Sequence, residues 1–88
     1  MKIKYDFETT ELGDQIVAVP VGDGARDFKG VITVNASGAA ILERLRKETT
    51  VEEITASLME EYEGTKEALM ASVEKMVVRL RSEGLLDE

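Results

Sequence analysis

Residues 28–45, with the sequence FKGVITVNASGAAILERL, decide the fold because a short apolar strand runs directly into a helix there. The β-branched run at 31–34 predicts the strand. Asn35 then stands where a capping side chain accepts a hydrogen bond from the first turn of a helix. The small residues at 36–40 let that helix approach a neighbouring backbone closely. The sequence before this stretch is typical of a sheet, and the sequence after it is typical of helices.

Two further strands are expected before this stretch. Residues 2–8 alternate strictly between apolar and charged side chains, which is the pattern of a half-buried strand. Its buried face is expected to consist of Ile3, Tyr5 and Phe7. After turn residues at 11–14, residues 15–21 are apolar on both faces, which predicts a central strand. Segment 22–27 predicts a glycine-containing loop, and the three strands together predict an antiparallel meander whose third strand keeps one unpaired edge.

Three helices are expected after the strands, which makes the chain a small α+β protein. The first follows Asn35, and the sequence TVEE at 50–53 is a capping box that opens the second. Thr65 caps a third helix over residues 66–83, and Gly84 ends it. At helical spacing, the expected core residues are Ile41, Leu42 and Leu45, then Val51, Ile54, Leu58 and Tyr62, then Leu69, Val73, Met76, Val77 and Leu80. The charged residues expected outside the first helix are Glu43, Arg44, Arg46 and Lys47.

The composition narrows the class of protein. The 88 residues are expected to form one domain, spanning 1–88. The chain has no Cys, and it has no apolar run with the length of a signal peptide or a membrane span, so we expect a cytoplasmic protein. Eleven basic and 18 acidic residues give a net charge of −7, which repels nucleic acid and anionic lipid. Neither nucleic acid nor a membrane is therefore an expected partner.

The residue types also argue against catalysis. With no His and no Cys, the usual general bases and activated nucleophiles are missing. Adjacent carboxylates such as Glu52 and Glu53 diverge around a helix axis, which suits neither a metal site nor acid–base chemistry. We therefore expect no enzyme activity, no catalytic residue, no metal ligand and no cofactor.

The order of four motifs resembles the PqqD family. That family comprises the pyrroloquinoline quinone biosynthesis protein D and the related recognition elements of ribosomally made, post-translationally modified peptides. The motifs, in chain order, are VNASGA at 34–39, TVEEI at 50–54, LMEEY at 58–62 and the segment 80–86, which ends in GLL. They span nearly the whole chain. Family members often carry a Trp just after the small residues of the first helix, where this chain has Ile41 and Leu42.

The resemblance implies a winged helix-turn-helix that performs no chemistry. In such a protein the third strand accepts the leader part of a precursor peptide as an added strand, and a cleft between that strand and the third helix holds the leader's side chains. The domain then acts as a peptide chaperone, which delivers the peptide to a modifying enzyme, commonly a radical SAM enzyme, in the biosynthesis of a cofactor or natural product.

The residues themselves suggest where a peptide would bind. An unpaired edge offers main-chain hydrogen bonds to an extended peptide, and by alternation Ile32 and Val34 should face the core while Val31 and Thr33 face away. On the third helix, one line at spacings of three or four residues is expected to form the wall of the groove, with Lys66 and Arg81 pairing with leader carboxylates. The predicted peptide-binding residues are Val31, Ile32, Thr33, Val34, Lys66, Met70, Val73, Val77 and Arg81.

Other interpretations stay open at this point. Val73 and Val77 can equally be ordinary core residues, and Lys66 and Arg81 can belong to a solvated face. The same fold can bind DNA, although the first turns of the third helix, TKEALMAS at 65–72, are poor in residues that read the major groove. A homodimer that pairs two copies through the free edge is the third alternative.

Overall fold

The computed structural model describes residues 1–22, 26 and 30–88 of the chain. The loop predicted at 22–27 therefore lies outside the described residues, apart from Gly22 and Arg26. The elements in chain order are β1 (Lys2–Ile3), β2 (Phe7–Leu12), β3 (Gln15–Pro20), β4 (Ile32–Val34), α2 (Ala36–Arg44), α3 (Val51–Glu61), α4 (Lys66–Ser82) and β5 (Leu86–Asp87). A three-stranded antiparallel sheet followed by three helices confirms the predicted α+β class and the winged helix-turn-helix.

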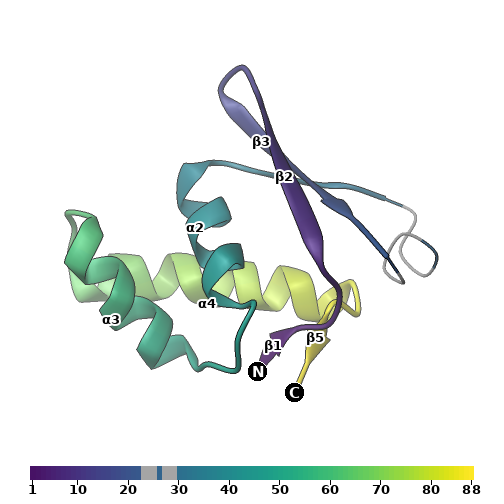
Figure 1. Cartoon of the computed structure of the whole chain (residues 1–88). Helices are drawn as coiled ribbons and strands as arrows, with labels where there is room; N and C mark the ends of the chain where they lie inside the picture. Colours follow the sequence, from purple (N-terminus) through teal and green to yellow (C-terminus); the bar gives the residue numbers. More distant parts are fainter. Residues whose placement is uncertain (23–25, 27–29) are drawn as a thin grey trace.

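The three-stranded sheet has the order β2-β3-β4, so the apolar strand β3 lies in the centre as predicted. The β2–β3 hairpin turns at Gly13, whose φ of +65° lies in the left-handed region that glycine adopts readily. Its tip projects beyond the helices (Figure 1). In β4, Ile32 and Val34 are buried while Thr33 is exposed, which confirms the predicted alternation.

The single strand predicted over residues 2–8 is wrong. The chain bends after Ile3, so that β1 pairs with β5 in a separate two-stranded sheet and β2 begins only at Phe7. Hydrogen bonds hold this bend, because the Ile3 N–H donates to the Leu45 carbonyl at 2.8 Å and the Lys4 N–H donates to the Leu85 carbonyl at 2.7 Å. Figure 1 shows β1 and β5 side by side near the two chain ends. Of the three side chains that the alternation placed on the buried face, Ile3 and Phe7 are buried, and Tyr5 packs half-buried against the core.

All three predicted helix caps are present. Asn35 Oδ1 accepts from the Gly38 N–H at 2.8 Å, and the hydroxyls of Thr50 and Thr65 each accept from the N–H three residues ahead at 3.1 Å. Each cap satisfies one of the N–H groups that a helix start leaves without a partner. At the other end of α4, Gly84 takes a φ of +73°, which stops the helix where the sequence indicated.

The helices form a layer on one side of the sheet. Helix α2 lies between the sheet and α4, and α3 packs beside α4 (Figure 1). Most of the predicted helix core is confirmed, since Ile41, Leu42, Leu45, Ile54, Leu58, Val73, Val77 and Leu80 are all buried, while Val51, Leu69 and Met76 pack against them half-buried.

Two predicted positions differ. Tyr62 is 39% exposed, because the backbone leaves the helical conformation there and turns the side chain off the face of α3. Arg44, expected outside, is largely covered, because it reaches from α2 to α3. It donates to Ser57 Oγ at 2.8 Å and pairs with the Glu61 carboxylate at 3.0 Å. This contact joins the two helices that the apolar pattern alone treated as independent.

Candidate functional site

The outer edge of β4 is the first part of the site. Among the described residues no strand pairs with this edge, since β4 is the last strand of the sheet. The Thr33 carbonyl accepts a hydrogen bond from the Arg79 guanidinium on α4, at 3.1 Å. In an antiparallel ladder the N–H and C=O of one residue point to the same side, and Ile32 and Val34 alternate with Thr33. The main chain of Thr33 therefore presents both a donor and an acceptor to the free edge.

A cavity of about 410 Å³ lies beside this edge. We call it the β4–α4 cleft. Three segments far apart in the sequence form its walls: the end of β4, the first turns of α2 and the middle of α4. The lining residues are Thr33, Val34, Asn35, Ser37, Gly38, Ile41, Ser72, Lys75, Met76 and Arg79.

The floor of the cleft is apolar and tightly packed. Val34, Gly38 and Ile41 are buried there, and Met76 is half-buried beside them. A Cβ at position 38 would lie 2.9 Å from both Val34 Cβ and Met76 Cε, which is closer than real Cβ contacts come. Glycine is thus needed at position 38 for the start of α2 to sit against β4 and α4.

The rim of the cleft is basic. Its only charged lining residues among those the structure describes are Lys75 and Arg79, both exposed and one helical turn apart on α4. The N-terminal end of α2, which carries partial positive charge, also opens here and has no acidic residue in its first turn. In a chain of net charge −7, this cleft is a local region of positive charge.

The structure divides the predicted site residues. Thr33 and Val34 line the β4–α4 cleft, and Val31 is 55% exposed just before β4. The side chain of Ile32 is fully buried in the core. None of the five predicted helix residues lines the cleft. Val73 and Val77 are core residues, Met70 is half-buried, and Lys66 and Arg81 are exposed near the two ends of α4.

The helical wall of the cleft lies one residue away from the predicted line. Ser72 and Met76 stand there in place of Val73 and Val77, which is a rotation of about 100° around the helix axis. The prediction followed the most apolar line of α4, and that line packs into the core. The spacing of Ser72, Lys75, Met76 and Arg79 would have identified the wall, because it places two cations and one apolar residue on one face of the helix.

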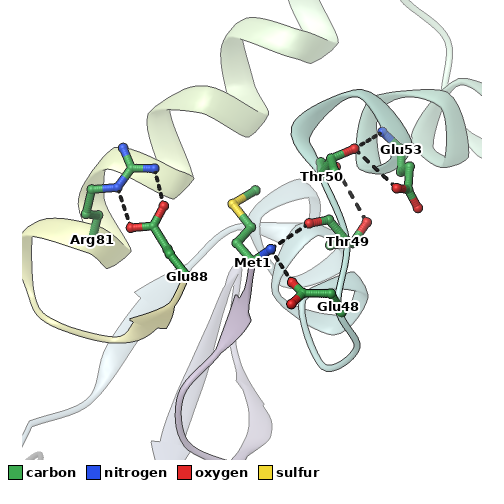
Figure 2. A network of polar contacts seen from close by, with 7 residues as sticks. All are labelled: Met1, Glu48, Thr49, Thr50, Glu53, Arg81 and Glu88. Atoms are coloured by element: carbon green, nitrogen blue, oxygen red, sulfur yellow. Dashed lines mark hydrogen bonds and ion pairs between the residues drawn. The ribbon is translucent and has the colours of Figure 1, made fainter.

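Separate polar contacts hold the two chain ends, one against the segment between α2 and α3 and the other against α4 (Figure 2). Arg81 donates two hydrogen bonds to the Glu88 carboxylate, at 2.9 and 2.7 Å, which lowers the pKa of Glu88 and raises that of Arg81. The Met1 ammonium pairs with the Glu48 carboxylate and donates to the Thr49 carbonyl, and the hydrogen bond from the ammonium lowers the pKa of Glu48. These contacts hold the start of the chain beside residues 48–49 and the end of the chain beside α4. None of the residues involved lines the cleft.

The described residues lack two features, a membrane-spanning helix and a metal-binding cluster. They contain no helix long and apolar enough to cross a membrane. They also contain no cluster of three acidic side chains placed to hold a metal ion.

Comparison with known proteins assigns the family. The model of the coenzyme PQQ synthesis protein D family (PqqD) matches residues 9–86, which include most of β2, the strands β3 and β4, the helices α2, α3 and α4, and the whole cleft. The chain belongs to the PqqD family. Among curated proteins, none matches the chain significantly.

One solved structure shows how closely the fold of this PqqD-family chain agrees with another protein. It is described as TbiB1 in complex with the TbiA(beta) leader peptide, and its chain is 21% identical, with a TM-score of 0.70 over 99% of this chain and 95% of that one. At this identity the likeness establishes the shared fold. The motifs quoted from the sequence thus pointed to the right family.

Proposed function

We propose that this protein is a non-catalytic accessory that binds the leader of a ribosomally made precursor peptide and presents it to a modifying enzyme, such as a radical SAM enzyme. The leader adds as a strand to the free edge of β4 and places alternate side chains in the β4–α4 cleft. Membership of the PqqD family supports this role. The similar fold of TbiB1, which was solved with a leader peptide, supports it as well.

The observation that carries the proposal is the position of Thr33. Its N–H and C=O point to the free edge, and its side of β4 borders a cavity of about 410 Å³. Strand addition needs both features, because main-chain hydrogen bonds hold an extended peptide while neighbouring pockets select its side chains.

A comparison of free energies indicates that contacts in the cleft contribute most of the affinity. β4 has three residues, so an added strand exchanges few hydrogen bonds with it, each with a net value of about 1 kcal/mol. A micromolar complex requires about 8 kcal/mol. Burying apolar side chains on Val34, Ile41 and Met76 adds roughly 25 cal/mol for each Å² removed from water. We therefore expect the side chains in the cleft to set which peptide binds.

The test begins with the native ligand. The tagged protein is recovered from its own cells, and co-purifying ribosomal peptides are identified by mass spectrometry. A recovered peptide is then synthesised and titrated against the protein by calorimetry, with duplex DNA titrated in parallel.

The proposal predicts saturable binding of the peptide and none of the DNA. Recovery of duplex DNA alone would contradict it. Saturable peptide binding that the substitution Thr33→Pro leaves unchanged would contradict strand addition at β4.

A further inference from the structure

The Arg79 guanidinium occupies the position that an added strand would use. Its Nη1 donates to the Thr33 carbonyl at 3.1 Å, and this carbonyl is the acceptor that the free edge of β4 offers. The contact joins residues 46 positions apart and is exposed to solvent. Arg79 therefore covers the main-chain acceptor of the free edge, beside the β4–α4 cleft, with a single hydrogen bond to a neutral group.

Arg79 differs from the other arginines that follow β4, each of which pairs with a carboxylate. Arg44 pairs with Glu61, Arg46 with Glu43 and Arg81 with Glu88. Within the described ranges, neither Lys75 nor Arg79 has a carboxylate at ion-pair distance, although acidic residues outnumber basic ones by 18 to 11. The chain thus leaves two cations without a carboxylate at the cavity where a ligand would lie.

We propose that Lys75 and Arg79 make the β4–α4 cleft selective for peptides that carry an Asp or Glu side chain, and that peptide binding transfers the Arg79 guanidinium from the Thr33 carbonyl to that carboxylate. This inference rests on the proposed function. The exchange is favourable because a carboxylate accepts two parallel hydrogen bonds from a guanidinium and adds the attraction of opposite charges, whereas the neutral carbonyl accepts one hydrogen bond. A peptide without a carboxylate displaces the guanidinium from the carbonyl and gives it no equivalent partner.

The geometry also predicts where the carboxylate lies in the peptide. Side chains of an extended peptide that point to the same face are two residues apart, or about 7 Å. The apolar floor at Val34 and Ile41 and the basic rim at Lys75 and Arg79 belong to one cavity. The preferred peptide therefore carries an apolar residue and an acidic residue separated by one position.

The experiment selects peptides without knowledge of the native leader. A display library of random 12-residue peptides is selected in parallel on three forms of the full chain: the wild type, the double variant Lys75→Gln/Arg79→Gln, and the control Lys47→Glu. The double variant and the control both change the net charge by −2. Lys47 is exposed and does not line the cleft. The control therefore separates the effect of losing positive charge in the cleft from the effect of a lower net charge. Circular dichroism checks that all three forms keep the same helix content.

We expect wild type and control to enrich peptides with an acidic residue two positions from an apolar one, and the double variant to lose the acidic preference. A synthetic peptide from the wild-type selection should bind about tenfold more tightly than its Glu→Gln or Asp→Asn counterpart, as one charged hydrogen bond implies. On the double variant that ratio should fall to about one. Enriched peptides without a preferred acidic position would overturn this inference and leave peptide binding intact, whereas enrichment of no peptide at all would overturn both.

Discussion

Thr33 is the residue of the sheet whose main chain is proposed to bind the peptide. Its side chain lies on the exposed face of β4, and its main chain points to the free edge. The exposed side chain follows from the alternation of a strand, so the sequence was sufficient to predict it once residues 31–34 were recognised as the third strand. The direction of the main chain follows from the pairing of β4 with β3 and from the contact with Arg79, which are tertiary properties. The contact from Arg79 was not predictable, because it joins two exposed residues from distant elements that carry no periodic signal.

At this scale we predict that Thr33→Pro weakens peptide binding while the fold persists. Proline removes the outward N–H and is tolerated on an edge strand, where that N–H has no partner in the sheet. Loss of one main-chain hydrogen bond should raise the dissociation constant about fivefold, measured by calorimetry with a selected peptide. The control Thr33→Ala keeps the N–H and should bind as the wild type does, so equal affinity of both variants would argue against strand addition.

For helix α4, the sequence pattern predicted some properties and not others. The pattern gave the bounds of the helix to within one residue, its Thr65 cap and its Gly84 stop. It also gave the core line through Val73, Val77 and Leu80. It did not identify the wall of the cleft, whose residues on α4 lie one position away from the core line and are mostly polar. That assignment depends on how α2 and β4 approach α4, which is a tertiary property.

The same limit explains the first strand. Alternation over residues 2–8 predicted which side chains are buried, but not that the chain bends between Ile3 and Phe7. The bend depends on carbonyls of Leu45 and Leu85, which are about 40 and 80 residues away in the sequence. A local sequence pattern cannot predict hydrogen bonds to such distant carbonyls.

At the scale of elements we predict that Gly38→Ala destabilises the fold and narrows the cleft. The added methyl group would meet Val34 Cβ and Met76 Cε at 2.9 Å. Overpacking costs about 1–3 kcal/mol, against a gain of about 1 kcal/mol in helix propensity. Since Met76 can move and Val34 Cβ cannot, we expect a net loss of about 1 kcal/mol in the free energy of unfolding, measured with urea.

A suitable control is Ala36→Gly, an exposed change in the first turn of the same helix. It alters helix propensity without entering the cleft, because Ala36 is not a lining residue. Gly38→Ala should also reduce peptide affinity, whereas Ala36→Gly should not. A stabilised Gly38→Ala variant with unchanged affinity would mean that α2 has room to move away from β4.

For the whole molecule, the ion pairs at the two chain ends make stability depend on pH in a defined direction. The pKa of Glu88 is lowered by its hydrogen bonds to Arg81, and that of Glu48 by its hydrogen bond from the Met1 ammonium. A carboxylate with a lowered pKa in the folded state adds stability above its unfolded pKa, about 4.3 for Glu. That stability is lost as the pH falls through the lower folded pKa.

We therefore predict that Glu88→Gln destabilises the protein slightly at pH 7 and that the difference from wild type shrinks on acidification below about pH 4. Both side chains are exposed, so the effect should be small and weaker at high salt. Thermal unfolding of both proteins across that pH range measures it. Peptide affinity should be unchanged at pH 7, because the pair lies outside the cleft; a loss of binding would place the end of α4 in the site.

If a peptide adds to the free edge of β4, it will protect the Thr33 amide from hydrogen exchange. The Thr33 N–H points away from β3, whereas the N–H groups of Ile32 and Val34 point toward it and serve as internal references. Exchange is followed by NMR with and without a saturating peptide obtained by selection on the wild type. We expect the Thr33 amide to exchange rapidly in the free protein and to become strongly protected when the peptide binds. A saturated complex in which the Thr33 amide still exchanges at its free rate would contradict strand addition at β4.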